Sequence, residues 1–173
     1  MYTQTDLAYL AGLLDGEGCF VIKLNNHEHF SQSVTIGMTD TRTVKWVQAT
    51  FGGLIFYTAS KSSKNENVST WALCKRLEVE KLISEVKPYL KTKLLQALIM
   101  EEFCKTFPKN KTYTILKKAE MAKYAEYMRT ANARGLGTAV VKERFLCTLL
   151  GQEYKEPVTK TLVDADELLC EIE

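Results

Sequence analysis

The sequence predicts an α+β protein in which helices pack against a four-stranded antiparallel sheet. Apolar residues recur at helical spacing near the N-terminus, two pairs of alternating segments follow, and helical patterns fill most of the C-terminal half. The chain has 173 residues, 46% of them hydrophobic, which is enough to bury a substantial core. We therefore expect a single domain over residues 1–173, with its core at about 6–107 and C-terminal helices at about 112–173.

The first helix and the first strand pair are predicted from a change of period. Four apolar residues recur three and four positions apart near the N-terminus: Leu7, Leu10, Ala11 and Leu14. Residues 19–25 then alternate apolar and polar, and so do residues 31–37, with a polar turn between them. The two segments are predicted to form a hairpin with one apolar and one polar face.

The same unit repeats once before the chain becomes helical. Asp40 is predicted to cap a helix that ends near Phe51, before Gly52. Residues 54–60 and 68–74 are predicted to form a second hairpin. Here we expect Leu54, Phe56, Trp71 and Leu73 to face the core, which leaves Tyr57 and Thr70 outward. Helices are then expected over residues 77–86, 90–107, 115–133 and 140–150, with a last amphipathic helix at the C-terminus.

Two glycines four residues apart interrupt the first helix. Gly12 and Gly16 lie on one helix face, and each costs about 1 kcal/mol relative to alanine. One interpretation is a close helix–helix contact with a second copy of the chain, which would form a twofold dimer. The alternative is a helix that packs on its own sheet. In the dimer, the expected interface residues are Leu10, Ala11, Gly12, Leu13, Asp15 and Gly16.

Acidic residues end this helix. In a twofold dimer, Glu17 of each chain would lie near its counterpart, and two neighbouring carboxylates repel unless a cation lies between them. Carboxylates together with water molecules are typical magnesium ligands. We therefore expect Glu17 to bind a metal ion; the alternative is a solvated acid at a helix end, where the helix dipole disfavours it.

The stretch LAGLLDGEG, residues 10–18, resembles the LAGLIDADG motif of homing endonucleases. It differs by leucine for isoleucine, glycine for alanine and glutamate for aspartate, and the predicted order αββαββα also matches that family. A similar stretch at 162–169 lacks the packing glycine, and no sheet-length segment follows it, so the chain is identified as a single-motif member.

The resemblance implies a site-specific DNA endonuclease that acts as a homodimer. It would make double-strand breaks with short 3′ overhangs at a long, near-palindromic site in double-stranded DNA. The implied cofactor is Mg²⁺, with two or three divalent ions per dimer active site, and Mn²⁺ is expected to substitute. Two alternatives stay open on the same fold: a maturase whose partner is intron RNA, and a catalytically retired DNA-binding protein.

The resemblance also assigns candidate active-site residues. Glu17 would be a metal ligand and Gly16 would contribute its backbone carbonyl oxygen. Lys93, in PYLKTKLLQA, matches the basic residue near the metals, with Lys91 as the fallback. Asp40 matches a polar position in the solvent network. Arg42 and Lys45 are the candidates for a basic position in that network, although Val44 occupies its expected place. The structural alternatives are an exposed lysine for Lys93 and a plain helix cap for Asp40.

The polar face of the sheet is the implied DNA-reading surface, and a two-stranded ribbon fits the major groove. The alternative is an ordinary solvated sheet face. Candidate DNA-binding residues are Lys23, Asn25, His27, Ser31, Ser33, Thr35, Tyr57, Lys61, Lys64, Thr70, Arg134 and Lys142.

The overall charge and hydropathy of the chain indicate less about its binding partners than the motif does. The chain has 23 basic and 21 acidic residues, and this net charge of +2 does not by itself establish a nucleic-acid partner. The cleanest apolar stretch has seven residues, too few to span a bilayer, so no membrane partner is expected. The first ten residues lack the features of a signal peptide, so we expect an intracellular location, whether an organelle or a bacterial or archaeal cytoplasm.

Overall fold

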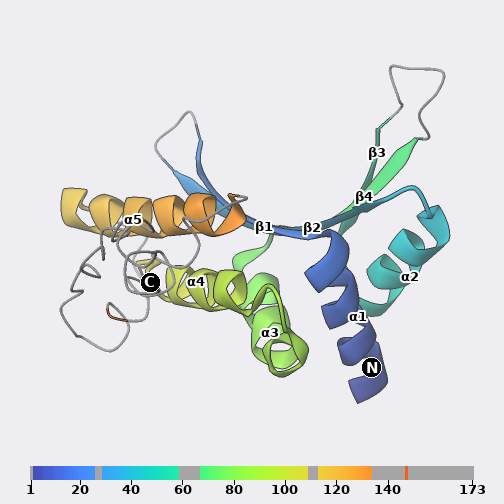
Figure 1. The fold of residues 1–173 in the computed structure, drawn as a ribbon. Coiled ribbons are helices and arrows are strands. Elements are labelled where there is room, and N and C mark those ends of the chain that lie inside the picture. The colour runs from blue at the N-terminus through green and yellow to red at the C-terminus, as the bar shows by residue number, and fades with distance from the viewer. Residues whose placement is uncertain (1, 26–28, 59–66, 109–112, 134–146, 148–173) are drawn as a thin grey trace, which may run out of the picture.

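The computed structural model describes residues 2–25, 29–58, 67–108, 113–133 and 147. The elements lie in the predicted order of helix, two strands, helix, two strands and helices (Figure 1). Their bounds are α1 (Gln4–Glu17), β1 (Gly18–Leu24), β2 (Phe30–Met38), α2 (Thr41–Phe51), β3 (Leu54–Thr58), β4 (Val68–Leu73), α3 (Arg76–Val86), the 3₁₀ helix η1 (Lys87–Tyr89), α4 (Leu94–Lys105) and α5 (Ile115–Asn132).

The four strands form one antiparallel sheet in the order β1-β2-β4-β3, as the α+β prediction requires. Helices α1 to α4 lie on one side of this sheet, and α5 lies along β1 and α4 (Figure 1). No helix within the described residues is both long enough and apolar enough to cross a bilayer.

The core lies between the sheet and these helices. Its largest fully buried side chains are Leu10, Leu14, Phe20, Ile36, Trp71, Leu73, Ile83, Ile99, Met100, Phe103 and Met121. The buried indole of Trp71 also donates a hydrogen bond of 2.6 Å to the carbonyl oxygen of Gly52, so the polar N–H of this ring has a partner. Burial of this apolar surface is the main term that holds the helices on the sheet.

The facing of the strands is as predicted in β1 and β2. Phe20, Val34 and Ile36 are fully buried, whereas Ser33 and Thr35 face away from the helices. We call the side of the sheet opposite the helices the outward face.

In β3 the prediction is wrong. The register pairs Ile55 with the buried Trp71, so Ile55 lies on the helix side and packs against the core. Leu54 and Phe56 therefore lie on the outward face, where 57% and 52% of their surfaces are exposed. Tyr57 pairs with the buried Ser69 and shares the helix side, so only Thr70 faces outward as expected.

The end of α1 is tied to the segment before α4 by one carboxylate. Asp15 accepts hydrogen bonds from the backbone N–H groups of Lys91 (2.8 Å), Thr92 (3.2 Å) and Lys93 (2.9 Å). These residues form a bend, so α4 begins at Leu94 and not at residue 90 as predicted. Asp15 was also expected at a dimer interface; its carboxylate is instead bound within the chain.

These contacts set the protonation of Asp15. Partial burial acts to raise the pKa of this carboxyl, but hydrogen bonds from Lys91, Lys93 and Thr92 outweigh it, so the pKa lies below its ordinary value of 3.8. Because the folded-state pKa is depressed, the ionised form stabilises the fold above pH 3.8. That contribution is lost as the pH falls through the lowered pKa.

We predict that Asp15→Asn lowers the free energy of unfolding at pH 7 by about 1–2 kcal/mol, because an amide keeps one acceptor oxygen and loses the charge. The deficit should shrink as the pH falls below 3.8, where wild-type Asp15 becomes protonated. Urea unfolding at several pH values measures this. Glu126→Gln, at an exposed pair with Arg129 on α5, is the control and should change little at any pH. An Asp15→Asn deficit that does not depend on pH would contradict the assignment.

Candidate functional site

The C-terminal end of α1 meets the sheet (Figure 1). The acidic side chain at this end is exposed. Glu17 is the last residue of the helix, and β1 begins at the next residue, Gly18. A Cβ atom at Gly18 would lie 2.6 Å from both the Cα and the carbonyl oxygen of Leu14. The transition from helix to strand is therefore tight enough to require glycine, and it leaves the Glu17 carboxylate in solvent.

Lys93 lies beside this helix end, as the sequence predicts. Its ammonium group donates hydrogen bonds to the carbonyl oxygens of Leu14 (2.8 Å) and Asp15 (3.0 Å). The Leu14 carbonyl also accepts a hydrogen bond from the backbone N–H of Gly18. A positive charge at the C-terminal end of a helix is favoured by the helix dipole. The two residues whose carbonyl oxygens bind Lys93 precede Glu17 by three and two positions. Lys91, by contrast, contacts α1 through its backbone N–H.

The end of α1 presents two oxygen donors to solvent. Within the described residues, no three His, Cys, Asp or Glu side chains gather in a way that could hold a metal ion. One carboxylate, Glu17, and the carbonyl of the exposed Gly16 are oxygen donors of the kind that Mg²⁺ prefers. The residues fit a magnesium ion when a second carboxylate is added, and the twofold dimer expected from the sequence would add Glu17 of a second copy.

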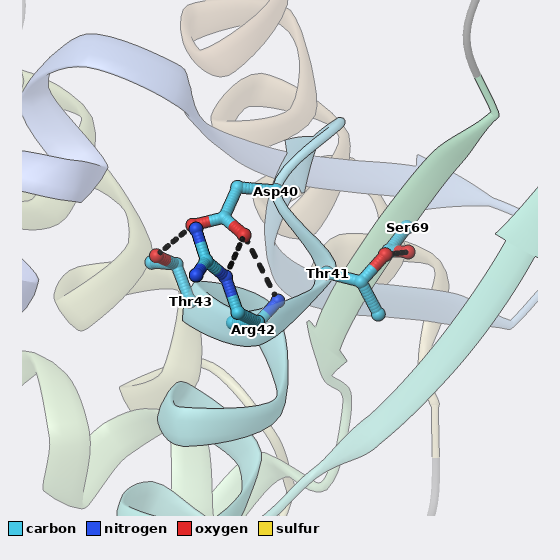
Figure 2. Close-up of polar contacts among 5 residues, drawn as sticks. All are labelled: Asp40, Thr41, Arg42, Thr43 and Ser69. Atoms are coloured by element: carbon cyan, nitrogen blue, oxygen red, sulfur yellow. Dashed lines mark hydrogen bonds and ion pairs between the residues drawn. The ribbon is translucent and has the colours of Figure 1, made fainter.

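Asp40 and Arg42 contact each other at the start of α2 (Figure 2). Asp40 is the helix N-cap: it accepts hydrogen bonds from the Thr43 hydroxyl (2.8 Å) and from the backbone N–H and the Nε of Arg42 (both 3.2 Å). These contacts, that from Thr43 foremost, lower the pKa of the Asp40 carboxyl. Hydrogen bonds within the chain thus favour the ionised form of Asp40.

The surroundings of this pair differ from those of Lys93. Asp40 and Arg42 line a hollow of about 350 Å³ together with Tyr9 and Trp46. Tyr9 lies eight residues before Glu17, which corresponds to about 12 Å along a helix. Lys93 thus binds carbonyl oxygens in the last turn of α1, whereas this pair lies beside Tyr9 and Trp46. Asp40 is the N-cap of α2, a position that is compatible with its predicted place in the solvent network, and Arg42 is almost fully exposed.

The outward face joins side chains from all four strands. Lys23 of β1 pairs with Ser31, and the Ser31 hydroxyl donates to the Asn25 side chain at 3.4 Å. Ser33, Thr35 and Thr70 share this face through the register of β2 with its two neighbours. The candidate DNA-binding residues that the structure describes, except Tyr57, are thus gathered on one surface. His27, Lys61, Lys64, Arg134 and Lys142 lie outside the described residues.

One side of α1 is exposed and free of side-chain bulk. A Cβ atom at Gly12 or Gly16 would meet no atom within 4 Å, so packing within this chain does not require glycine at either position. Helix α1 does pack on the chain's own sheet, through the buried Leu10 and Leu14, as the alternative expects, but Gly12 and Gly16 take no part in that packing. Leu10 and Ala11 were expected at the dimer interface, but they are fully buried in the chain's own core and cannot also contact a partner. Leu13, partly buried, packs against that core as well.

Two features of the site were missed from the sequence. The first is the outward placement of Leu54 and Phe56, described above. The second is a cavity of about 560 Å³ between β1 and α5, which Lys23 and Arg129 both line. Asn132 also lines this hollow, and its side chain donates a 2.7 Å hydrogen bond to the Phe20 carbonyl. No local pattern signals a contact between residues more than a hundred positions apart.

No protein-family model matches the chain, and a search of curated proteins found no related sequence. Among solved structures, the chain is similar to the homing endonuclease I-CvuI in complex with its target. The TM-score is 0.59 at 21% identity, over 87% of this chain and 98% of that one.

Two further structures agree in fold. The archaeal intron-encoded homing endonuclease I-Vdi141I, complexed with DNA, gives a TM-score of 0.62 at 15% identity, over 82% of this chain and 98% of that one. The LAGLIDADG meganuclease I-AabMI, bound to uncleaved DNA, gives 0.57 at 16% identity, over 86% of this chain but 50% of that one. The chain therefore has the fold of the LAGLIDADG homing endonucleases, as the motif at residues 10–18 and the order of its elements predict.

Proposed function

We propose that this protein is a site-specific endonuclease for double-stranded DNA that acts as a homodimer and requires magnesium. The observation that carries the proposal is the end of α1, where an exposed Glu17 and an anchored Lys93 lie at the start of the outward sheet face. The similarity to homing endonucleases solved with DNA supports the same reading of this surface. The proposed products are double-strand breaks with short 3′ overhangs at a long, near-palindromic site.

Glu17 is the proposed metal ligand, together with the carbonyl oxygen of Gly16. Bound Mg²⁺ would supply an activated water and stabilise the leaving oxygen of the phosphodiester. Mn²⁺ is proposed to substitute, because it takes the same oxygen ligands. Two or three ions would be shared between the two chains of a dimer, since one chain offers a single free carboxylate at this place.

Lys93 is proposed to act on the phosphate. Its ammonium group is already fixed by two carbonyl oxygens, so little reorganisation is needed when negative charge develops nearby. A preorganised charge of this kind stabilises a transition state more than a mobile one does. Asp40 and Arg42 are proposed as the polar and basic members of the solvent network around the site. In this chain Asp40 accepts hydrogen bonds from Arg42 and Thr43.

The dimer is proposed to form through the exposed side of α1. The absence of atoms near Gly12 and Gly16 leaves a smooth helix surface on which a second copy of α1 can pack closely. The comparison with I-AabMI is consistent with a dimer, because 86% of the present chain matches only 50% of that longer chain.

We predict that Glu17→Gln abolishes DNA cleavage and leaves DNA binding within a few-fold of wild type, because the amide cannot replace an anionic metal ligand. The measurement is plasmid cleavage with Mg²⁺, using inserts with randomised or host-derived sequence, together with a binding assay. Glu78→Gln, on α3, is the matched control and should cleave normally. Cleavage that persists in Glu17→Gln would overturn the site; binding without cleavage by wild type would favour the retired DNA-binding protein or the intron RNA maturase.

We predict that Lys93→Met lowers the cleavage rate at saturating DNA by about 100-fold, the size expected when one preorganised charge is removed. The dissociation constant for DNA should change less than threefold. Lys91→Met is the matched control, because the Lys91 side chain makes no such contact with α1, and its rate should stay near wild type. Thermal unfolding of each variant separates a folding defect from a catalytic one, and equal rates for the two variants would contradict the role of Lys93.

We predict that Gly12→Leu makes the protein monomeric in sedimentation at micromolar concentration, since a bulky side chain would block close packing of two α1 helices. The monomer should stay folded, because a Cβ at Gly12 meets no atom within 4 Å and leucine is the better helix former. Ala122→Leu, at an exposed position on α5, is the control and should not alter the oligomeric state. A wild-type protein that is monomeric even with DNA bound would overturn the proposed dimer.

A further inference from the structure

We propose that the β3–β4 ribbon selects thymine in the DNA site through the C5-methyl groups of the bases, with Leu54 and Phe56 as the specificity-determining side chains. This inference rests on the proposed DNA-binding function and adds to it which bases one half of the outward face recognises.

Leu54 and Phe56 project from the outward face because their neighbours are small. The register places Leu54 opposite Ala72 and Phe56 opposite Thr70, and Thr70 is in turn opposite Gly37 of β2. Both projecting side chains are more than half exposed. Two adjacent large apolar side chains exposed on the same face indicate a binding surface, whereas a single exposed apolar side chain is normal on a protein surface.

The outward face has two chemically different halves. The β1–β2 half presents Lys23, Asn25, Ser31 and Ser33, which can form hydrogen bonds. The β3–β4 half presents Leu54 and Phe56, and at its outer end Val68, which is 37% exposed. Among the outward positions that the structure describes on the four strands, none is acidic, so the whole face is compatible with the negative charge of DNA.

The chemistry of the apolar half restricts what it can recognise. Leucine and phenylalanine side chains cannot form hydrogen bonds with base edges. In the major groove, the apolar group offered by the bases is the C5-methyl group of thymine. Since this half continues directly into the polar half through the β2–β4 pairing, the same DNA would cover both, and its thymine methyl groups would be the natural contacts of Leu54 and Phe56.

The test compares thymine with uracil, which lacks only the methyl group. The full-length protein is first used to select bound duplexes from a randomised pool. The selected site is then resynthesised with uracil in place of each thymine in turn, and dissociation constants are measured for wild type, for the Leu54→Ala/Phe56→Ala double variant, and for Leu77→Ala. Leu77 is a leucine of similar exposure on α3 and serves as the matched control.

Wild type and Leu77→Ala are expected to bind about fourfold more weakly for each contacted methyl group that is removed, at two or more positions of the half-site. The double variant should bind thymine and uracil duplexes equally. Equal wild-type affinity for both bases at every position, or full discrimination by the double variant, would overturn the inference while DNA binding stands. A changed oligomeric state of the double variant with an unchanged thymine preference would overturn it as well, in favour of a protein contact. Failure of wild type to bind any duplex would remove the proposed function itself.

Discussion

The reciprocal link between α1 and the bend before α4 is the interaction on which the rest of the site depends. The Asp15 carboxylate binds three backbone N–H groups of that bend, and the Lys93 ammonium returns to two carbonyl oxygens of α1. The link fixes where α1 ends, where β1 starts and where α4 begins. It therefore sets the position of Glu17, although Glu17 takes no part in it.

This link also explains why the motif ends in two acids separated by one residue. Side chains two positions apart on a helix point about 200° away from each other, so they face nearly opposite sides. Asp15 faces the bend before α4, where its hydrogen bonds lower the pKa of the carboxyl. Glu17 faces solvent and stays available to a ligand. One acid therefore holds the fold and the other is left for chemistry.

The sequence was sufficient wherever polar and apolar residues alternate. Val34 and Ile36 against Ser33 and Thr35 give the facing of β2, and Asp40 marks the start of α2. In β3 the four residues Leu54 to Tyr57 are all apolar or aromatic, so no contrast indicates a face; the pairing of Ile55 with Trp71 decides it. The late start of α4 and the contact of Asn132 with β1 likewise depend on distant partners. Local patterns cannot encode such contacts.

The three glycines of the motif separate what the chain needs for itself from what it offers to a partner. Gly18 is required within the chain, because a Cβ atom there would overlap the backbone of Leu14. Gly12 and Gly16 are not required within the chain, so their helix-propensity cost is left uncompensated in the monomer. In the proposed dimer, close packing at these glycines would offset that cost and would also bring two Glu17 carboxylates together. Dimerisation and metal binding would then be coupled, because the half site of one chain holds too few oxygen ligands to retain a magnesium ion by itself.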